Sequence, residues 1–403
     1  MMRHLGAAVA AVSLSLACRG EPVRAQRDAT IAQLVDSLKP AVERAAGFRF
    51  RTTPRSAMRS RDQVRAYLIA KLRQELPPSR VRGIETAYRL LALLPDTLEL
   101  EPLLVNLYSE QVAGYYDPDS TMLFGVTGAD RLQLRLVLAH EMVHALQGQY
   151  LPLDSILHDI RSNDRLTAAQ AVLEGQATLV SIRVLSPGVD VTAQQGFWDE
   201  YREQVAEQQD AMPVFAHAPL LIRETLLFPY LDGAEFMRWW GTSALRDSLP
   251  AGARMPASTE QILTPDRYRQ GDQPVALRFV AGSRPRTYED DLGELEIRVL
   301  DAQLRGDVEA PRDIAPIGWG GDLYGLFDSP KGAALVWYVV WDDPASDDRF
   351  LAASGARLRA RERPGYRVEL TRVEVDRRPA SRFVIAPTEW AGWRDLPRVE
   401  VVR

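Results

Sequence analysis

The sequence predicts an α+β protein: a mainly helical part with a small sheet, followed by a second α+β part. Apolar residues repeat at helical spacing through most of the chain up to about residue 246, whereas β-branched and aromatic runs alternate with helical stretches after residue 275. A loop rich in Pro, Ser and Thr at 250–275 separates them. We therefore expect domains at 26–274 and 275–403, and 403 residues suffice for two cores.

The first domain is expected to be helical with one hairpin. Three helices are predicted between about residue 28 and residue 95, and the later ones are Glu101–Gln111, Arg131–Leu146, Leu166–Leu185, 195–210 and 219–246. Between the fourth and fifth helices, two aromatic and apolar runs flank a turn at Asp117–Ser120, which predicts a β-hairpin over Ala113–Val126.

The second domain is expected to mix helices with strands. Helices are predicted at Leu292–Leu304 and Asp347–Arg361, and strands at Ala334–Trp341, Arg367–Val375 and Arg382–Ile385. The segment Gly318–Asp322 is interpreted as a tight turn with a packed Trp319, with a ligand-recognition loop as the alternative. The residues of this domain do not indicate its function.

The first 25 residues are typical of a secretory signal. A short basic start precedes an uncharged apolar run that ends at Arg19. Ser15-Leu16-Ala17-Cys18 resembles a lipobox, which would make Cys18 a lipidated N-terminus; ordinary cleavage after Ala17 or Ala25 is the alternative. Both predict an extracytoplasmic protein whose contact with a membrane is limited to an N-terminal lipid. A net charge of −5 gives no reason to expect a nucleic-acid partner.

The strongest chemical signal is His140-Glu141-Met142-Val143-His144, within a helix that is apolar on nearly every side. Residues four apart project from one helix face, so the two imidazoles can bind one metal ion, with Glu141 beside them as a base for its bound water. A chance match in a chain of this length has odds on the order of a few in a thousand. The alternative is a pair of core histidines that only hydrogen-bond.

A catalytic zinc site usually has three protein ligands, and Glu174 is the candidate for the third. It is the only acidic residue between Arg165 and Leu185, on a predicted helix whose other positions are mostly apolar. Gly175 beside it would allow a backbone or the metal to approach closely. An exposed helix face is the alternative, and His158 and Asp164 are weaker candidates for the ligand.

These motifs resemble those of the gluzincin class of zinc metallopeptidases. The similarity covers roughly residues 100–270 and extends to secreted bacterial proteins of this type. It implies that His140, His144 and Glu174 bind one Zn²⁺, that Glu141 is the general base, and that the hairpin offers an edge strand to a peptide. The class carries Asn before the third ligand, where this chain has Leu173.

A developing oxyanion needs a donor, and His217 and Tyr230 lie where related enzymes place one. Their alternative roles are a loop histidine and a core aromatic. The sequence thus predicts an extracytoplasmic, zinc-dependent peptidase that acts on peptides or proteins. Two alternatives remain: a non-catalytic envelope lipoprotein with a structural or silent metal site, and a zinc hydrolase acting on a non-peptide bond.

Overall fold

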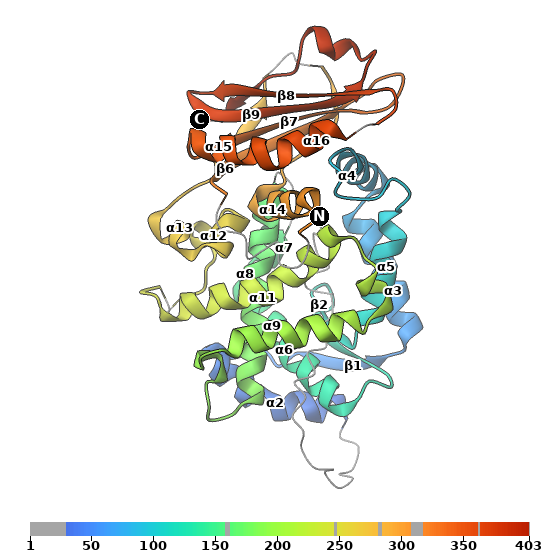
Figure 1. Cartoon of the computed structure of the whole chain (residues 1–403). Helices are drawn as coiled ribbons and strands as arrows, with labels where there is room; N and C mark the ends of the chain where they lie inside the picture. Colours follow the sequence, from blue (N-terminus) through green and yellow to red (C-terminus); the bar gives the residue numbers. More distant parts are fainter. Residues whose placement is uncertain are drawn as a thin grey trace.

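The computed structural model describes residues 30–157, 162–245, 248–280, 284–307, 317–361 and 363–402. It is a mixed α+β structure, with a helical region at one end and a five-stranded sheet at the other (Figure 1). The predicted signal segment with Cys18 lies outside the described residues. Among the residues described, no helix is long and apolar enough to cross a membrane.

The helical region contains the predicted helices and several short ones. They are α2 (Ile31–Ala46), α3 (Arg61–Glu75), α4 (Pro78–Leu90), α5 (Leu100–Gln111), α6 (Arg131–Tyr150), α7 (Leu153–Leu157), α8 (Asn163–Leu185), α9 (Phe197–Asp210), α10 (Pro213–Ala216), α11 (Leu220–Thr242), α12 (Thr259–Leu263) and α13 (Pro265–Gln270). The predicted loop at 250–275 was wrong in part, because Ser258 caps α12 and Pro265 begins α13.

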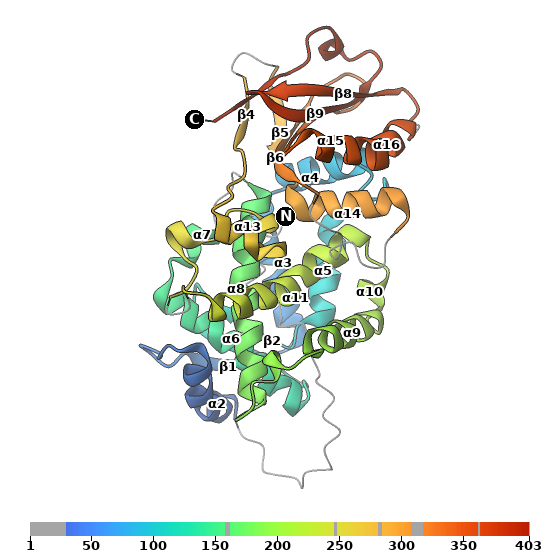
Figure 2. The same ribbon diagram turned by 60° about the vertical axis from the view of Figure 1, so that its left-hand side comes forward.

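A three-stranded sheet lies beside α6. The predicted hairpin is confirmed as β2 (Gly114–Asp117) and β3 (Met122–Val126), which pair antiparallel. A third strand, β1 (Arg55–Arg59), pairs with β3 in parallel and was not predicted. The order β1-β3-β2 leaves β2 at the edge of the sheet that is closest to the centre of the helical region (Figure 2).

The two longest helices, α8 and α11, pack against each other in the middle of the helical region, and α8 also packs against α6 (Figure 2). Nearly every residue of α8 is buried, which explains why its sequence shows little amphipathic pattern. The side chains that α6, α8 and α11 direct at one another therefore meet in the interior.

The C-terminal region is built on an antiparallel sheet of order β5-β6-β7-β9-β8. Its elements are β5 (Arg286–Asp290), α14 (Gly293–Arg305), β6 (Trp319–Phe327), β7 (Ala334–Trp341), α15 (Pro344–Phe350), α16 (Ala356–Ala360), β8 (Tyr366–Val375) and β9 (Arg378–Pro387), with a separate pair formed by β4 (Leu277–Phe279) and β10 (Val399–Val401). The predicted helices and strands are present. The predicted turn at Gly318–Asp322 was wrong, because β6 begins there with a bulge, but the predicted packing of Trp319 is confirmed by its burial.

Two acidic side chains of the C-terminal region anchor the start of α8. The backbone N–H of Asn163 donates to Asp290 at 2.9 Å, and that of Asp164 donates to Asp291 at 2.8 Å. Because the first N–H groups of a helix have no partner within it, these oxygens stabilise its N-terminus by accepting from them. One apolar core includes side chains from both regions, among them Leu104 and Trp337.

Candidate metal centre

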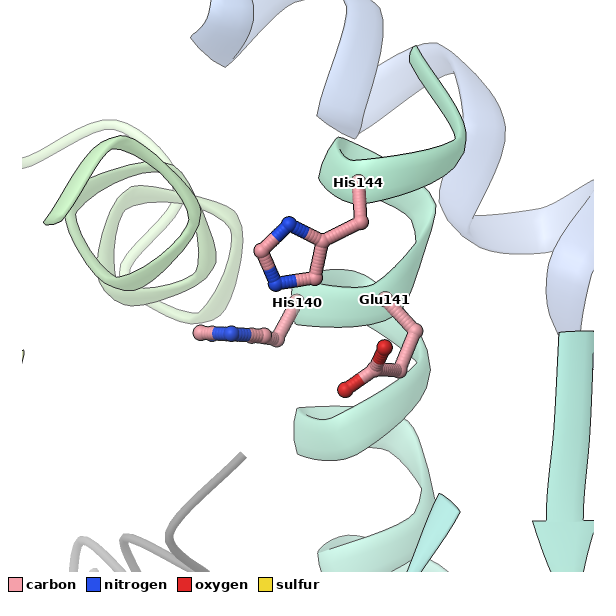
Figure 3. A group of neighbouring side chains, drawn as sticks. All are labelled: His140, Glu141 and His144. Atoms are coloured by element: carbon pink, nitrogen blue, oxygen red, sulfur yellow. The ribbon is translucent and has the colours of Figure 1, made fainter. Parts of the chain in front are cut away.

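The helix α6 brings three chemically active side chains into the interior. Asp130 caps its N-terminus by accepting from two backbone N–H groups, and the following turns are buried from position 136 to position 147. His140, Glu141 and His144 are 3%, 1% and 2% exposed. Figure 3 shows the two imidazole rings projecting from the same side of the helix, one turn apart, with the Glu141 carboxylate beside them.

These three side chains form a group that could hold a metal ion. One ligand atom from each lies within 4.8 Å of the others. The imidazole rings of His140 and His144 are nearly perpendicular, with an interplanar angle of 72°. The two ring nitrogens can thus point at one ion without the rings stacking. The alternative of core histidines without a metal would bury these polar groups at a cost of several kcal/mol.

Glu174 on α8 joins the group from the opposite side. Its Oε2 lies 3.0 Å from Nε2 of His140 and 3.3 Å from Nε2 of His144. The Nε2 atom of His144 is buried and makes no hydrogen bond, although Glu174 is near. Two ligands about 2.0–2.1 Å from a tetrahedral zinc are themselves roughly 3.3 Å apart. The spacing and the unbonded nitrogen both fit a metal ligand set.

The charges of the group are strongly coupled. Burial alone would raise the pKa of Glu174, but the two histidines hold this pKa below its ordinary value. Burial lowers the pKa of His140. Burial would also lower the pKa of His144, but the nearby Glu174 carboxylate raises this pKa to about 9. Without metal, Glu174 is thus held as a carboxylate and His144 holds a proton, which a bound metal ion would displace.

Glu141 is held differently from the other three. Its Oε2 accepts a 2.8 Å hydrogen bond from the backbone N–H of Tyr116 on β2. This bond directs the carboxylate toward the edge of the small sheet, whereas Glu174 contacts the histidine nitrogens. The contact thus links the base candidate to the strand that the sequence analysis expected beside the substrate.

Of the two predicted oxyanion donors, the structure brings one to the site. Tyr230 on α11 is buried, its ring centroid lies 6.0 Å from that of His140, and its hydroxyl donates to Glu174. Burial, followed by the negative charges of Glu174 and Glu141, raises the pKa of Tyr230 well above its usual value. His217 is exposed after α10, with Nδ1 2.8 Å from the carbonyl of Pro213, and its role stays a prediction.

The weaker candidates for the third ligand fare differently. Asp164 lies ten residues before Glu174 on the same helix, about 15 Å along its axis, and accepts from Thr259 instead. It is thus not near the histidines, and that alternative was wrong. His158 lies outside the described residues.

A second group of acidic side chains, formed by Glu260, Asp272 and Asp342, surrounds the guanidinium of Arg267. This guanidinium supplies the positive charge that balances the carboxylates.

Gln147 contacts His144 and was not predicted from the sequence. Its Oε1 lies 2.9 Å from Nδ1 of His144. A signal was present: Gln147 is the next polar residue after His144 on an otherwise apolar stretch, three positions along, where a helix places a neighbouring side chain. Polar residues at that spacing from a metal-binding histidine are candidates for its second hydrogen-bond partner.

The comparisons with known proteins found no relative. No family model, no curated protein and no solved structure matches the chain. What the chain can do must therefore be argued from its buried His140, Glu141 and His144 group and the residues around it.

Proposed function

We propose that this chain is a zinc-dependent peptidase of the gluzincin type, with His140, His144 and Glu174 as metal ligands. The observation that carries the proposal is the position of Glu174 Oε2, which lies within 3.3 Å of Nε2 of each histidine. Three protein ligands from two helices would leave the fourth position of a tetrahedral zinc to water, the arrangement typical of catalytic zinc sites.

The donor set favours zinc over other ions. Two neutral imidazoles and one carboxylate suit Zn²⁺, whereas Ca²⁺ and Mg²⁺ prefer oxygen ligands alone. Zinc in such a site would supply Lewis acidity and lower the pKa of a bound water toward 7. The net charge of its ligands would be −1, which leaves a positive centre facing the substrate.

Glu141 is the proposed general base. Its carboxylate is buried beside the ligands and is kept in place by the N–H of Tyr116. In this position Glu141 accepts a proton from the attacking water and passes it to the leaving amine. A positioned acid–base group of this kind increases the rate by about 10²–10⁴-fold.

The edge strand β2 supports a peptide as the substrate. The carbonyl of Ala113 accepts a hydrogen bond from the backbone N–H of Val126, which ends β3. In an antiparallel pair, every second residue directs its N–H away from the partner strand. The N–H groups of Gly114 and Tyr116 therefore face away from β3. Tyr116 uses its N–H on Glu141, so the edge of β2 that does not pair with β3 lies beside the base, among buried residues. An extended peptide that pairs with this edge would bring its scissile bond next to Glu141.

Tyr230 is the proposed donor to the oxyanion. Its hydroxyl remains protonated because its pKa is raised, and it lies beside both carboxylates of the site. When the substrate carbonyl gains negative charge, a hydroxyl fixed in a buried site stabilises that charge more than water would. The predicted signal peptide would place this activity outside the cytoplasm, on a lipid anchor if Cys18 is modified.

The test of the proposal is peptide hydrolysis by the zinc-loaded protein and its Glu141→Gln variant on a mixed peptide library. We expect the variant to retain zinc and to lose hydrolysis by at least about 100-fold. Glu207→Gln, an exposed position on α9, is the matched control and should behave as the wild type. Equal hydrolysis by Glu141→Gln would overturn the proposal, and zinc binding without turnover would indicate a non-catalytic metal protein.

A further inference from the structure

The side chain of Gln147 connects the two helices that carry the proposed ligands. It is 2% exposed, and its Oε1 lies 2.9 Å from Nδ1 of His144 on its own helix. Its Nε2 lies 2.9 Å from the carbonyl oxygen of Leu173 and 2.9 Å from Oε1 of Gln176, both on α8. Each polar atom of this buried amide therefore has a partner.

These partners fix the orientation of the amide. A backbone carbonyl can only accept a hydrogen bond, so the atom of Gln147 that faces Leu173 is the NH₂ group. The oxygen must then face Nδ1 of His144, which has to carry the hydrogen of that bond. When a metal displaces the second proton of His144, the ring keeps its hydrogen on Nδ1 and has a bare lone pair on Nε2, the atom that faces Glu174.

The contact with Leu173 extends the arrangement to the third ligand. Leu173 directly precedes Glu174, so the amide joins His144 to the backbone that presents the carboxylate. The resembled class carries Asn at this position, whereas the side chain of Leu173 has no polar atom. In this chain, the side-chain amide of Gln147 on α6 donates to the backbone carbonyl of Leu173 instead.

We propose that Gln147 is a positioning residue of the metal centre. It holds His144 as the tautomer with hydrogen on Nδ1 and fixes the spacing between His144 and Glu174. The inference rests on the metal-binding part of the proposed function and does not depend on peptide hydrolysis. Partners of this kind typically change metal affinity by about 10- to 100-fold when they are removed.

The test measures Zn²⁺ affinity of the full chain by competition with a chromophoric chelator. We expect Gln147→Leu to weaken zinc binding by about 10- to 100-fold. The matched control is Gln149→Leu on the same helix, whose amide contacts the backbone of Arg51 and Thr52 and not the site, and it should stay within about twofold of the wild type.

A second readout separates positioning from a loss of structure. Nitrogen NMR of ring-labelled histidines in the zinc-loaded wild type should show His144 bound through Nε2 with hydrogen on Nδ1. Metal bound through Nδ1, or a Gln147→Leu variant that binds zinc as tightly as the wild type, would overturn the inference while leaving the peptidase proposal intact. If the wild type hydrolyses no peptide but Gln147→Leu still binds zinc more weakly than the wild type, the inference about Gln147 stands. A wild type that binds no zinc would overturn both this inference and the peptidase proposal.

Discussion

Gly175 of α8 lies against Gly233 of α11, and a Cβ atom added to Gly175 would be 2.2 Å from the carbonyl carbon of Gly233. The two helices are also close on the other side of the contact: a Cβ added to Gly233 would be 2.2 Å from the carbonyl oxygen of Ala171 on α8. Both clashes involve backbone atoms, which cannot rotate away. The close approach of the two helices allows Tyr230 of α11 to reach Glu174 of α8.

Gly175→Ala should therefore destabilise the protein and disturb the metal centre. Overpacking of this kind costs about 1–3 kcal/mol, and any separation of the helices moves Glu174 away from Tyr230. Urea unfolding and zinc affinity would both report the change. Gly241→Ala on α11 is the control: nothing lies within 4 Å of its added Cβ, so it should stabilise the helix by up to about 1 kcal/mol.

Tyr230→Phe should lower peptide hydrolysis more than it lowers zinc binding. Loss of one oxyanion donor typically costs about 10²–10³ in kcat, and saturating zinc would compensate for a weakened contact with Glu174. Steady-state kinetics at saturating zinc would measure this effect. His217→Ala should change kcat by less than about threefold, because His217 is exposed and bonded to Pro213. The opposite ranking of the two variants would assign the donor role to His217.

The buried side chain of Asp164, at the start of α8, predicts that the stability of the folded chain falls as pH rises. Asp164 is buried, and burial, with repulsion from Asp322 and Glu294, raises its pKa to about 8 despite hydrogen bonds from Thr259. The unfolded chain releases this proton near its ordinary value of 3.8, so between these values the native state binds more protons. Stability should then decrease by about 2 kcal/mol from pH 6 to pH 8.

Asp164→Asn should reduce this dependence, since the amide resembles the protonated acid. The slope that remains belongs to Asp291, Glu260 and Glu296, whose pKa values burial also raises. The variant is expected to match the wild type at pH 6 and to exceed it in stability at pH 9, as measured by urea unfolding at both values. Asp36→Asn, at an exposed position of α2, should keep the slope of the wild type. A wild type whose stability rises over this range would show that Asp164 is ionised in the native state.

Local patterns predicted the elements that form the candidate site. The spacing of His140 and His144 was sufficient to place both rings on one face of α6. One isolated acid on an apolar helix indicated Glu174, which the structure places 3.0 Å from His140. Gly175 indicated a close approach, which the structure confirms with Gly233 as the partner. For His140, His144 and Glu174 the signal was a polar residue in apolar surroundings, and for Gly175 it was a glycine inside a helix.

Other features depend on contacts between distant segments. The strand β1 pairs with β3 across more than sixty residues, and its sequence, Arg55–Arg59, has no alternating pattern to reveal it. The start of β6 at Trp319 was taken for a turn because glycines surround it, but the indole donates to Asp322 within the core. Gln147 was missed because its partners on α8 become neighbours only after folding.

The proposed metal centre is tested by the zinc content of the purified mature protein and of its His140→Ala, Glu174→Ala and Glu174→Gln variants. We expect about one zinc per wild-type chain and its loss in all three variants, with circular dichroism showing that they remain folded. Full zinc in both Glu174 variants would show that the third ligand is another residue. A wild type that binds no zinc, even when zinc is offered, would show that His140, His144 and Glu174 do not form a zinc site.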